Sequence, residues 1–242
     1  WCWGYNAYGQ LGDGSTANRV APGLVAGISD AVEVSAGYLH TCARHRSGAV
    51  SCWGYNVHGM LGDGTTVTRL VPVAVSGIAT AAEVTSGTAH SCVRLADGSM
   101  RCWGYNAYGQ LGDGTTVTRP VPGVVPGLST VVEVSTGDDV WRPSGSGSAA
   151  DRTCARLADG TVRCWGYNGY GGVGDGTTTN RLVPTAVFGL TDATELAEGG
   201  RYHTCARRAD RTLMCWGYNG NGQLGDGTTS SRAAPGLVAG FP

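Results

Sequence analysis

Cys102-Trp103-Gly104-Tyr105-Asn106-Ala107-Tyr108-Gly109-Gln110-Leu111-Gly112-Asp113-Gly114-Thr115-Thr116 is one of five near-identical stretches in this chain. The other copies begin at Cys2, Cys52, Cys164 and Cys215, so successive copies lie 50, 50, 62 and 51 residues apart. A period near fifty is typical of repeat proteins, in which each copy is one supersecondary unit stacked on its neighbours. The chain is therefore predicted to be a tandem array.

Each repeat contains four short segments with the character of β-strands. In the first full repeat they cover residues 31–35, 40–44, 49–54 and 71–75, with a long polar loop over 55–69. Glycine at the turns, with tryptophan and β-branched residues between them, favours strands over helices. Pro72 suits an edge strand, because proline lacks the N–H that a central strand donates. We therefore predict an all-β fold, a β-propeller of four-stranded antiparallel blades with about five repeats present.

The repeats together form a single domain that covers residues 1–242. A half-repeat over 1–30 precedes full repeats over 31–80, 81–130, 131–192 and 193–242. The third full repeat carries extra residues at 138–152, which account for the spacing of 62. Because this segment is rich in serine and glycine, we expect it to be a surface loop on one side of the array.

Eight of the nine cysteines form pairs that are ten residues apart. A hairpin that ends at Leu157–Thr161, with Gly160 in the left-handed conformation, places Cys154 directly opposite Cys164. Facing cysteines in neighbouring strands are within disulfide reach. The predicted disulfides are Cys42–Cys52, Cys92–Cys102, Cys154–Cys164 and Cys205–Cys215. Four disulfides indicate an oxidising compartment, so we expect the protein to be secreted or at the cell surface; four reduced thiol pairs are the alternative.

Cys2 has no partner at this spacing, because the matching position would precede Trp1. The chain holds five copies of the second half of the repeat and four of the first. We expect a longer natural polypeptide of which this is a part. An array that closes differently and an open arc are the alternatives.

The motif Trp-Gly-Tyr-Asn-x-x-Gly-Gln-Leu-Gly-Asp-Gly, preceded by Cys-Ala-Arg-Leu-Ala-Asp-Gly-Thr-Val-Arg-Cys at residues 154–164, resembles the regulator of chromosome condensation repeat family. The resemblance covers essentially the whole chain. It implies a β-propeller that is seven-bladed when intact. The cysteines resemble those of a secreted bacterial branch of the family, and five repeats are too few for a ring of that size.

Composition argues against several classes of function. The chain has 17 basic residues, all arginine, and a net charge of −1, and its arginines are scattered. Nucleic-acid binding requires a basic face, so no nucleic-acid partner is expected. No window of eighteen apolar residues occurs, so we expect no membrane insertion. No cofactor is expected.

Several polar residues recur at one position of every repeat. Asp13 and Arg19 and their equivalents are predicted to fix the long loop, and calcium is the weaker interpretation of Gly-Asp-Gly. His40, His90 and His203 are interpreted as packing residues rather than a metal funnel. The periodic glutamates Glu33, Glu83, Glu133 and Glu195 leave paired carboxylates for glycoside cleavage open, but no pair stands out. We predict no catalytic residues and no metal site, and a non-catalytic function is favoured.

Binding residues are expected where the repeats differ. One variable loop position holds Tyr8, His58, Tyr108 and Tyr170, side chains suited to protein contacts or to stacking on sugars; filling of gaps between loops is the structural alternative. The second candidate is the insertion, with Asp138, Asp139, Trp141 and Arg142, since tryptophan and arginine are enriched at interface hot spots. A tolerated surface loop is its alternative.

Three hypotheses of function follow. The first is an extracellular, disulfide-stapled propeller scaffold that binds another protein, as the resemblance to bacterial inhibitors with similar repeats implies. The nuclear family member that acts as a nucleotide exchange factor is a poorer analogue for a disulfide-bearing, nearly neutral chain. The second is a carbohydrate-binding or carbohydrate-cleaving protein with a glycan as partner. The third is a structural or adhesive segment that self-assembles head to tail.

Overall fold

The computed structural model describes residues 1–137, 151–199 and 202–241. All its regular elements are β-strands, arranged in five antiparallel sheets. The first sheet has two strands, β1 (Cys2–Gly4) and β2 (Arg19–Gly23). Within the described part of the chain, no helix has the length and apolar character that crossing a membrane requires.

The other four sheets have four strands each, and we number them as blades one to four. The first blade contains β3 (Ala31–Ala36), β4 (His40–His45), β5 (Val50–Gly54) and β6 (Arg69–Ala74). The second contains β7 (Ala81–Ser86), β8 (His90–Leu95), β9 (Met100–Gly104) and β10 (Arg119–Val124). The third contains β11 (Val131–Thr136), β12 (Arg152–Leu157), β13 (Val162–Gly166) and β14 (Arg181–Ala186). The fourth contains β15 (Ala193–Gly199), β16 (His203–Arg208), β17 (Leu213–Gly217) and β18 (Arg232–Leu237).

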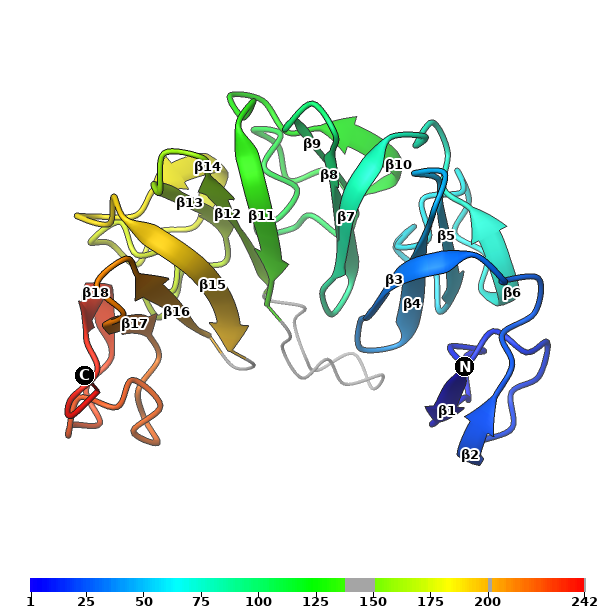
Figure 1. Cartoon of the computed structure of the whole chain (residues 1–242), viewed down its shortest axis with the longest axis horizontal. Helices are drawn as coiled ribbons and strands as arrows, with labels where there is room; N and C mark the ends of the chain where they lie inside the picture. Colours follow the sequence, from blue (N-terminus) through cyan, green and yellow to red (C-terminus); the bar gives the residue numbers. More distant parts are fainter. Residues whose placement is uncertain (138–150, 200–201, 242) are drawn as a thin grey trace.

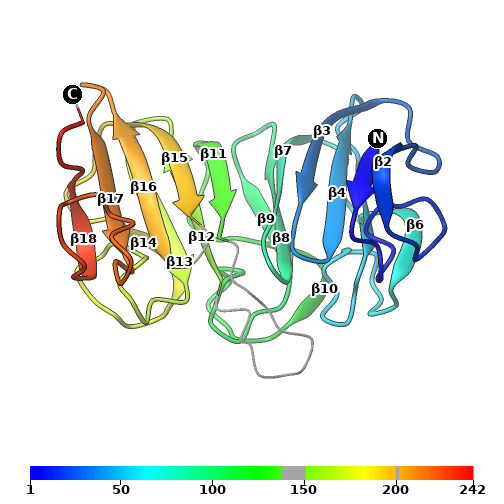
Figure 2. The ribbon, with the colours of Figure 1, turned by 90° about the horizontal axis from the view of Figure 1, so that it is seen from below.

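The sheets follow one another around an arc, with the two termini at its opposite ends (Figure 1). Seen from the concave side, the first strands β3, β7, β11 and β15 stand side by side (Figure 2). The last strand of each blade is an edge strand, which agrees with the expected edge position of Pro72. The predicted all-β propeller architecture of four-stranded antiparallel blades is confirmed.

Disulfides join the second and third strands at the centre of every blade. Cys154 lies opposite Cys164 in the β12–β13 register, as the hairpin predicts, and Gly160 has φ of +81°. The four bonded pairs are Cys42–Cys52, Cys92–Cys102, Cys154–Cys164 and Cys205–Cys215. Among the described cysteines, Cys2 is the free one.

The core lies between consecutive blades. Trp103 is fully buried, and the cluster around it combines Cys42, Cys52 and Val50 of the first blade with Val84 of the second. Trp53, Trp165 and Trp216 occupy the same position of their repeats and are buried in the same way. Trp3 departs from this arrangement, with an exposed fraction of 59%, because no described sheet lies before it in the arc.

Glycine is required where the buried tryptophan of a blade, such as Trp103, lies against the long loop of the preceding blade. Gly62 has φ of +68°, and a Cβ at this position would come within 2.8 Å of Trp103 Nε1. Glycine adopts this left-handed conformation without the steric cost that a Cβ brings. The close approach of a tryptophan from the next blade is an additional reason that the sequence does not disclose.

Candidate functional site

One end of every blade carries the long loop that follows the third strand. Antiparallel order brings this loop to the same end as the connection between the first two strands, and main-chain bonds join them. Tyr55 N–H donates to Leu39 O at 2.9 Å, and Tyr105 N–H donates to Ala89 O at 2.9 Å. We call this end of the blades the tyrosine face. The short hairpins, such as that at Asp97, lie at the opposite end.

A buried asparagine holds each long loop in shape. In the second blade, Asn106 Nδ2 donates to Thr115 O and Val117 O, both at 3.1 Å, and Leu111 N–H donates to Asn106 Oδ1 at 2.9 Å. The same side chain has the same role in the other repeats, at Asn6, Asn56, Asn168 and Asn219. Our sequence interpretation missed these residues, although their presence in all five copies was an available signal.

An aspartate and an arginine close the same loop, as predicted. In the first blade, Thr65 donates to Asp63 Oδ1 from N–H at 2.9 Å and from Oγ1 at 2.8 Å. Arg69 Nε donates to Asp63 Oδ2 at 3.0 Å. Burial alone would raise the pKa of Asp63, but the hydrogen bonds from Thr65 and Arg69 together lower the pKa below its usual value. The loops therefore form a firm support for the side chains they display.

Aromatic rings from successive loops contact one another across this face. Four ring contacts join one loop to the next. The distances between their ring centroids are 4.8 Å for Tyr8–Tyr55, 4.8 Å for His58–Tyr105, 5.3 Å for Tyr108–Tyr167 and 4.9 Å for Tyr170–Tyr218. Tyr5 contacts Tyr8 at 6.5 Å, and Tyr202 contacts both Tyr167 and Tyr170. We call these side chains the tyrosine row: Tyr5, Tyr8, Tyr55, His58, Tyr105, Tyr108, Tyr167, Tyr170, Tyr202 and Tyr218.

The row both fills space between the loops and remains open to solvent. Most of its rings are half-buried, whereas Tyr5 is 54% and Tyr170 is 40% exposed. Burial raises the pKa of Tyr105, and the neighbouring Tyr108 raises it further. Tyr105 thus stays uncharged in neutral solution. The rings of the row together form an amphipathic surface of rigid side chains.

The described residues that flank the insertion lie on the same face. Tyr167 N–H donates to Asp151 O at 2.9 Å, and Gly137 N–H donates to Arg152 O at 3.1 Å. The carboxylate of Asp151 is buried and accepts a hydrogen bond of 2.9 Å from Thr88 N–H of the preceding blade. The residues on either side of the insertion, Gly137 and Asp151, are therefore held beside the tyrosine row. The predicted site residues Asp138, Asp139, Trp141 and Arg142 lie outside the described residues.

The recurring histidines connect neighbouring blades. His40 Nε2 lies 2.9 Å from Ser91 Oγ, and His90 Nε2 lies 2.9 Å from Thr153 Oγ1. Burial lowers the pKa of His40 to about 3, with a smaller contribution from His90, so its ring is neutral. Among the described residues, no group of three or more histidine, cysteine, aspartate or glutamate side chains is placed to hold a metal ion. His40 and His90 are thus buried side chains that pack at the interfaces between blades.

The recurring glutamates form ion pairs along the inner strands. Their partners are in the second strand of the same blade: Glu33–Arg44 at 2.7 Å, Glu83–Arg94 at 3.0 Å, Glu133–Arg156 at 2.7 Å and Glu195–Arg207 at 3.2 Å. Glu83 Oε1 also accepts a hydrogen bond of 3.2 Å from Val134 N–H of the next blade. These carboxylates connect strands and blades, and each has an arginine rather than a second carboxylate as its partner.

The fold and the repeated loops define a β-propeller repeat protein with an aromatic row on one face. The regulator of chromosome condensation (RCC1) repeat matches residues 1–44, 47–94, 97–140 and 159–207, and a second description of that repeat matches 31–59, 81–110 and 198–223. Since these matches cover most of the chain, the protein belongs to the RCC1 repeat family.

Curated relatives share part of the chain. The chain is 36% identical over 92 residues to the probable E3 ubiquitin-protein ligase HERC4 of Homo sapiens. The matched stretch covers 37% of this chain and 9% of that protein. The chain is also 36% identical over 86 residues to the human E3 ubiquitin-protein ligase HERC2, 35% of this chain and 2% of that protein. The chain thus spans less than a tenth of these relatives' length.

Solved structures share the fold. Yeast RCC1 (Prp20), in its complex with Kap60, has a TM-score of 0.78 at 18% identity, over 98% of this chain and 56% of that one. Human WBSCR16 has a TM-score of 0.76 at 24% identity, over 96% of this chain and 60% of that one. The ectodomain of the Physcomitrella patens receptor kinase CR4 has a TM-score of 0.50 at 25% identity, over 90% of this chain and 47% of that one.

Proposed function

We propose that this protein is an extracellular, non-catalytic scaffold that binds another protein through the tyrosine row. The observation that carries the proposal is the contact between aromatic rings of each two successive loops across one face. Tyrosine provides a large contact area at a low cost in conformational entropy, and it is enriched at interface hot spots. The buried asparagines keep the loops in place, so little ordering is required on binding.

Similar proteins support a protein partner. Yeast RCC1 (Prp20) was solved in complex with Kap60, and a further structure of Prp20p was described with its binding to Gsp1p and histones. These partners belong to that protein, and the propeller fold is what it shares with this chain. The four disulfides and the similarity to a receptor ectodomain support an extracellular location.

A photo-crosslinking amino acid at position 108 tests this proposal. The same amino acid at position 97, in the short hairpin at the opposite end of the same blade, is the matched control. Proteins from the secreted fraction of the source culture are cross-linked and identified, and the affinity of each is then measured. We expect a partner that is captured from position 108 and not from 97. Equal capture at both positions would contradict the proposal.

Two substitutions in one loop check the affinity. Tyr108→Ala should weaken binding at least tenfold, about 1.4 kcal/mol, because its ring contacts Tyr167 of the next blade. Val117→Ala should change the affinity less than twofold, since Val117 is 64% exposed and lies in the same loop. Equal effects of the two variants would show that the row is not the contact surface.

A glycan is the second candidate partner, and the exposure of Tyr5 and Tyr170 favours it. Stacking on a sugar requires an open ring face, whereas the edge-to-face contacts, such as Tyr170–Tyr218 at an interplanar angle of 64°, leave each ring partly covered by a neighbour. A glycan array with the wild type and the Tyr170→Ala variant separates the two candidates. Binding that is lost in this variant would favour the glycan.

A further inference from the structure

Four tyrosine rings gather where the loops of the third and fourth blades meet. Tyr167 and Tyr170 follow β13 in the third blade, and Tyr218 follows β17 in the fourth. Tyr202 lies in the connection between β15 and β16, and its ring centroid is 5.4 Å from that of Tyr167 and 5.0 Å from that of Tyr170. Tyr170 also contacts Tyr218 at 4.9 Å. We call these four side chains the tyrosine cluster, and its ring contacts join the two blades.

Tyr202 is an exception among the residues at its position. None of the corresponding residues in the other blades is aromatic: they are Leu39, Ala89 and Asp151. Tyr202 has a φ of +69°, in the left-handed region that bulky residues rarely adopt. A residue in this region is kept there by the structure around it. The ring contacts with Tyr167 and Tyr170 are part of that support, so the ring is held in the cluster.

Tyr170 and Tyr202 lie in the orientation that best suits a bond between two rings. Their interplanar angle is 37°, whereas the other contacts between tyrosines of the row lie at 51° to 78°. Tyr8 and Tyr55 lie slightly closer, at 4.8 Å, but at 64° the edge of one ring meets the face of the other. Two ring carbons couple through their π orbitals, which overlap better between tilted rings than between nearly perpendicular ones.

Exposure favours a bond within the chain. Tyr170 is 40% exposed, so an oxidant in solution reaches its ring. Tyr202 is half-buried beside it. A radical on Tyr170 therefore has a tyrosine of its own chain in contact before a second molecule arrives.

We propose that the tyrosine cluster is an oxidative cross-linking site, at which a haem peroxidase with hydrogen peroxide joins Tyr170 to Tyr202 through a dityrosine bond. This bond links the third blade to the fourth, whereas the disulfides Cys154–Cys164 and Cys205–Cys215 each lie within one blade. The proposal does not depend on the proposed function, because it requires only the contact of the two rings.

The peroxide supplies the oxidising equivalents. Through the peroxidase, each phenol loses one electron and its hydroxyl proton and becomes a neutral phenoxyl radical. The two radicals couple between ring carbons ortho to the oxygens, so one C–C bond forms. The hydrogen on each of these carbons then leaves as a proton, and each phenolic oxygen takes up a proton, which restores both aromatic rings. Hydrogen peroxide accepts two electrons and two protons in total, so its O–O bond breaks and two waters form.

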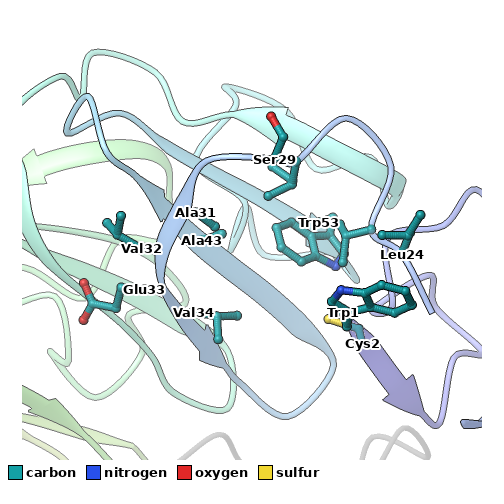
Figure 3. A pocket seen from close by; sticks show the side chains of 12 residues that line it. Trp1, Cys2, Leu24, Ser29, Ala31, Val32, Glu33, Val34, Ala43 and Trp53 are labelled. Carbon is teal, nitrogen blue, oxygen red and sulfur yellow. The ribbon is translucent and has the colours of Figure 1, made fainter. Parts of the chain in front are cut away.

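Two exposed aromatic side chains outside the row compete for the oxidant. Trp1 is 73% exposed beside a pocket that it lines together with Trp53, as Figure 3 shows. Tyr38 is 41% exposed. Within the described part of the chain, neither Trp1 nor Tyr38 has a tyrosine ring in contact. Radicals on these two side chains are therefore expected to couple between molecules, with a yield that rises with protein concentration.

Peptide mapping after oxidation is the test. Dilute protein is treated with a haem peroxidase and one equivalent of hydrogen peroxide, its disulfides are reduced, and it is digested with trypsin. Arg181 lies between Tyr170 and Tyr202 in the sequence, so trypsin separates the two tyrosines. We expect a linked peptide pair, two hydrogens lighter than its parts, with the bond between these side chains. Its yield should exceed that of a Tyr8–Tyr55 link at least tenfold, and unfolding in urea before oxidation should abolish the difference.

Three variants control the measurement. Tyr202→Phe keeps a ring in the cluster but cannot form a phenoxyl radical, so the yield of dityrosine at Tyr170 should fall at least tenfold. Tyr38→Phe and Trp1→Phe remove the competing side chains, and they should leave the yield of the Tyr170–Tyr202 bond unchanged or higher.

Three results would overturn the proposal. The first is an equal yield at Tyr170–Tyr202 and at Tyr8–Tyr55. The second is cross-linking chiefly between molecules, with a yield that rises with protein concentration. The third is dityrosine at Tyr170 that persists in Tyr202→Phe, which would assign the reaction to Tyr167 or Tyr218 instead.

Discussion

The indole nitrogen of Trp103 donates a hydrogen bond of 2.7 Å to the main-chain oxygen of Met60, which lies in the long loop of the preceding blade. The bond recurs between the other blades: Trp53 to Gln10 O at 2.9 Å, Trp165 to Gln110 O at 3.0 Å and Trp216 to Gly172 O at 2.9 Å. One side chain thus fills the interface between two blades and satisfies a buried carbonyl of its neighbour.

Replacing this tryptophan should be costly. Trp103→Phe removes the donor to Met60 O and part of the packed volume, so we expect the free energy of unfolding to fall by about 2–3 kcal/mol. Trp3→Phe is the matched control, and it should change stability by less than about 0.5 kcal/mol because Trp3 is largely exposed. Urea unfolding followed by circular dichroism measures both. Equal losses would show that the interface does not carry the stability.

The glycine beneath the indole offers a test of close packing. Gly62 and Gly77 have nearly equal φ values of +68° and +67°, but a Cβ at Gly77 meets nothing within 4 Å. Gly77→Ala should therefore cost only the backbone strain of about 1–2 kcal/mol. Gly62→Ala should cost about 1–3 kcal/mol more, because its Cβ would collide with the Trp103 ring. Thermal unfolding of the two variants compares them; similar melting temperatures would count against the contact.

Loss of one disulfide should destabilise a blade. The double variant Cys92→Ala/Cys102→Ala opens the small loop that this bond closes, and we expect a loss of about 2–4 kcal/mol in the free energy of unfolding. Cys2→Ala removes a free thiol and should have little effect. Non-reducing peptide mapping of the wild type should find the four pairs. Eight free thiols would disprove the pairing and remove the main support for an extracellular location.

The buried His40 should make stability depend on pH. Its pKa is about 3 in the folded chain and about 6.5 when unfolded, so below pH 6.5 the unfolded chain binds the proton and the folded chain does not. The contribution of neutral His40 to the free energy of unfolding is then fully present above pH 6.5, and it is lost as the pH decreases toward 3. Between pH 7 and 5 this histidine should account for a loss of about 2 kcal/mol.

Comparison with His40→Gln isolates that contribution. The glutamine amide can still donate to Ser91 Oγ, the partner of His40 Nε2, and it does not titrate. The variant is expected to be less stable at pH 7, yet its urea midpoint should change less between pH 7 and 5 than that of the wild type. An unchanged pH dependence would assign the effect to other groups.

Much of the blade followed from local patterns in the sequence. The hairpin length predicted that Cys154 faces Cys164, and the repeated Asp–Arg spacing predicted the pair between Asp63 and Arg69. Such contacts join residues a few positions apart in one turn or hairpin, so the backbone geometry of that element decides them. The repetition of each pattern removed the ambiguity that a single copy would have left.

The candidate site was predicted only in part. Tyr8, His58, Tyr108 and Tyr170 were selected because their position varies between repeats, but the sequence did not tell whether the rings touch. Tyr202 was missed, since it lies in the connection between β15 and β16 and reaches the row only through the fold.

By itself, the sequence determined the repeat, the strands, the disulfide register and the loops, because each depends on contacts within about fifty residues of one blade. The tertiary structure alone decided how blades meet: the ring contact between Tyr108 and Tyr167, the bond from His40 to Ser91, and the burial of Val84 in one cluster with Cys42 and Cys52 of the preceding blade. These features depend on the placement of one sheet against the next, which the close packing of many side chains determines together.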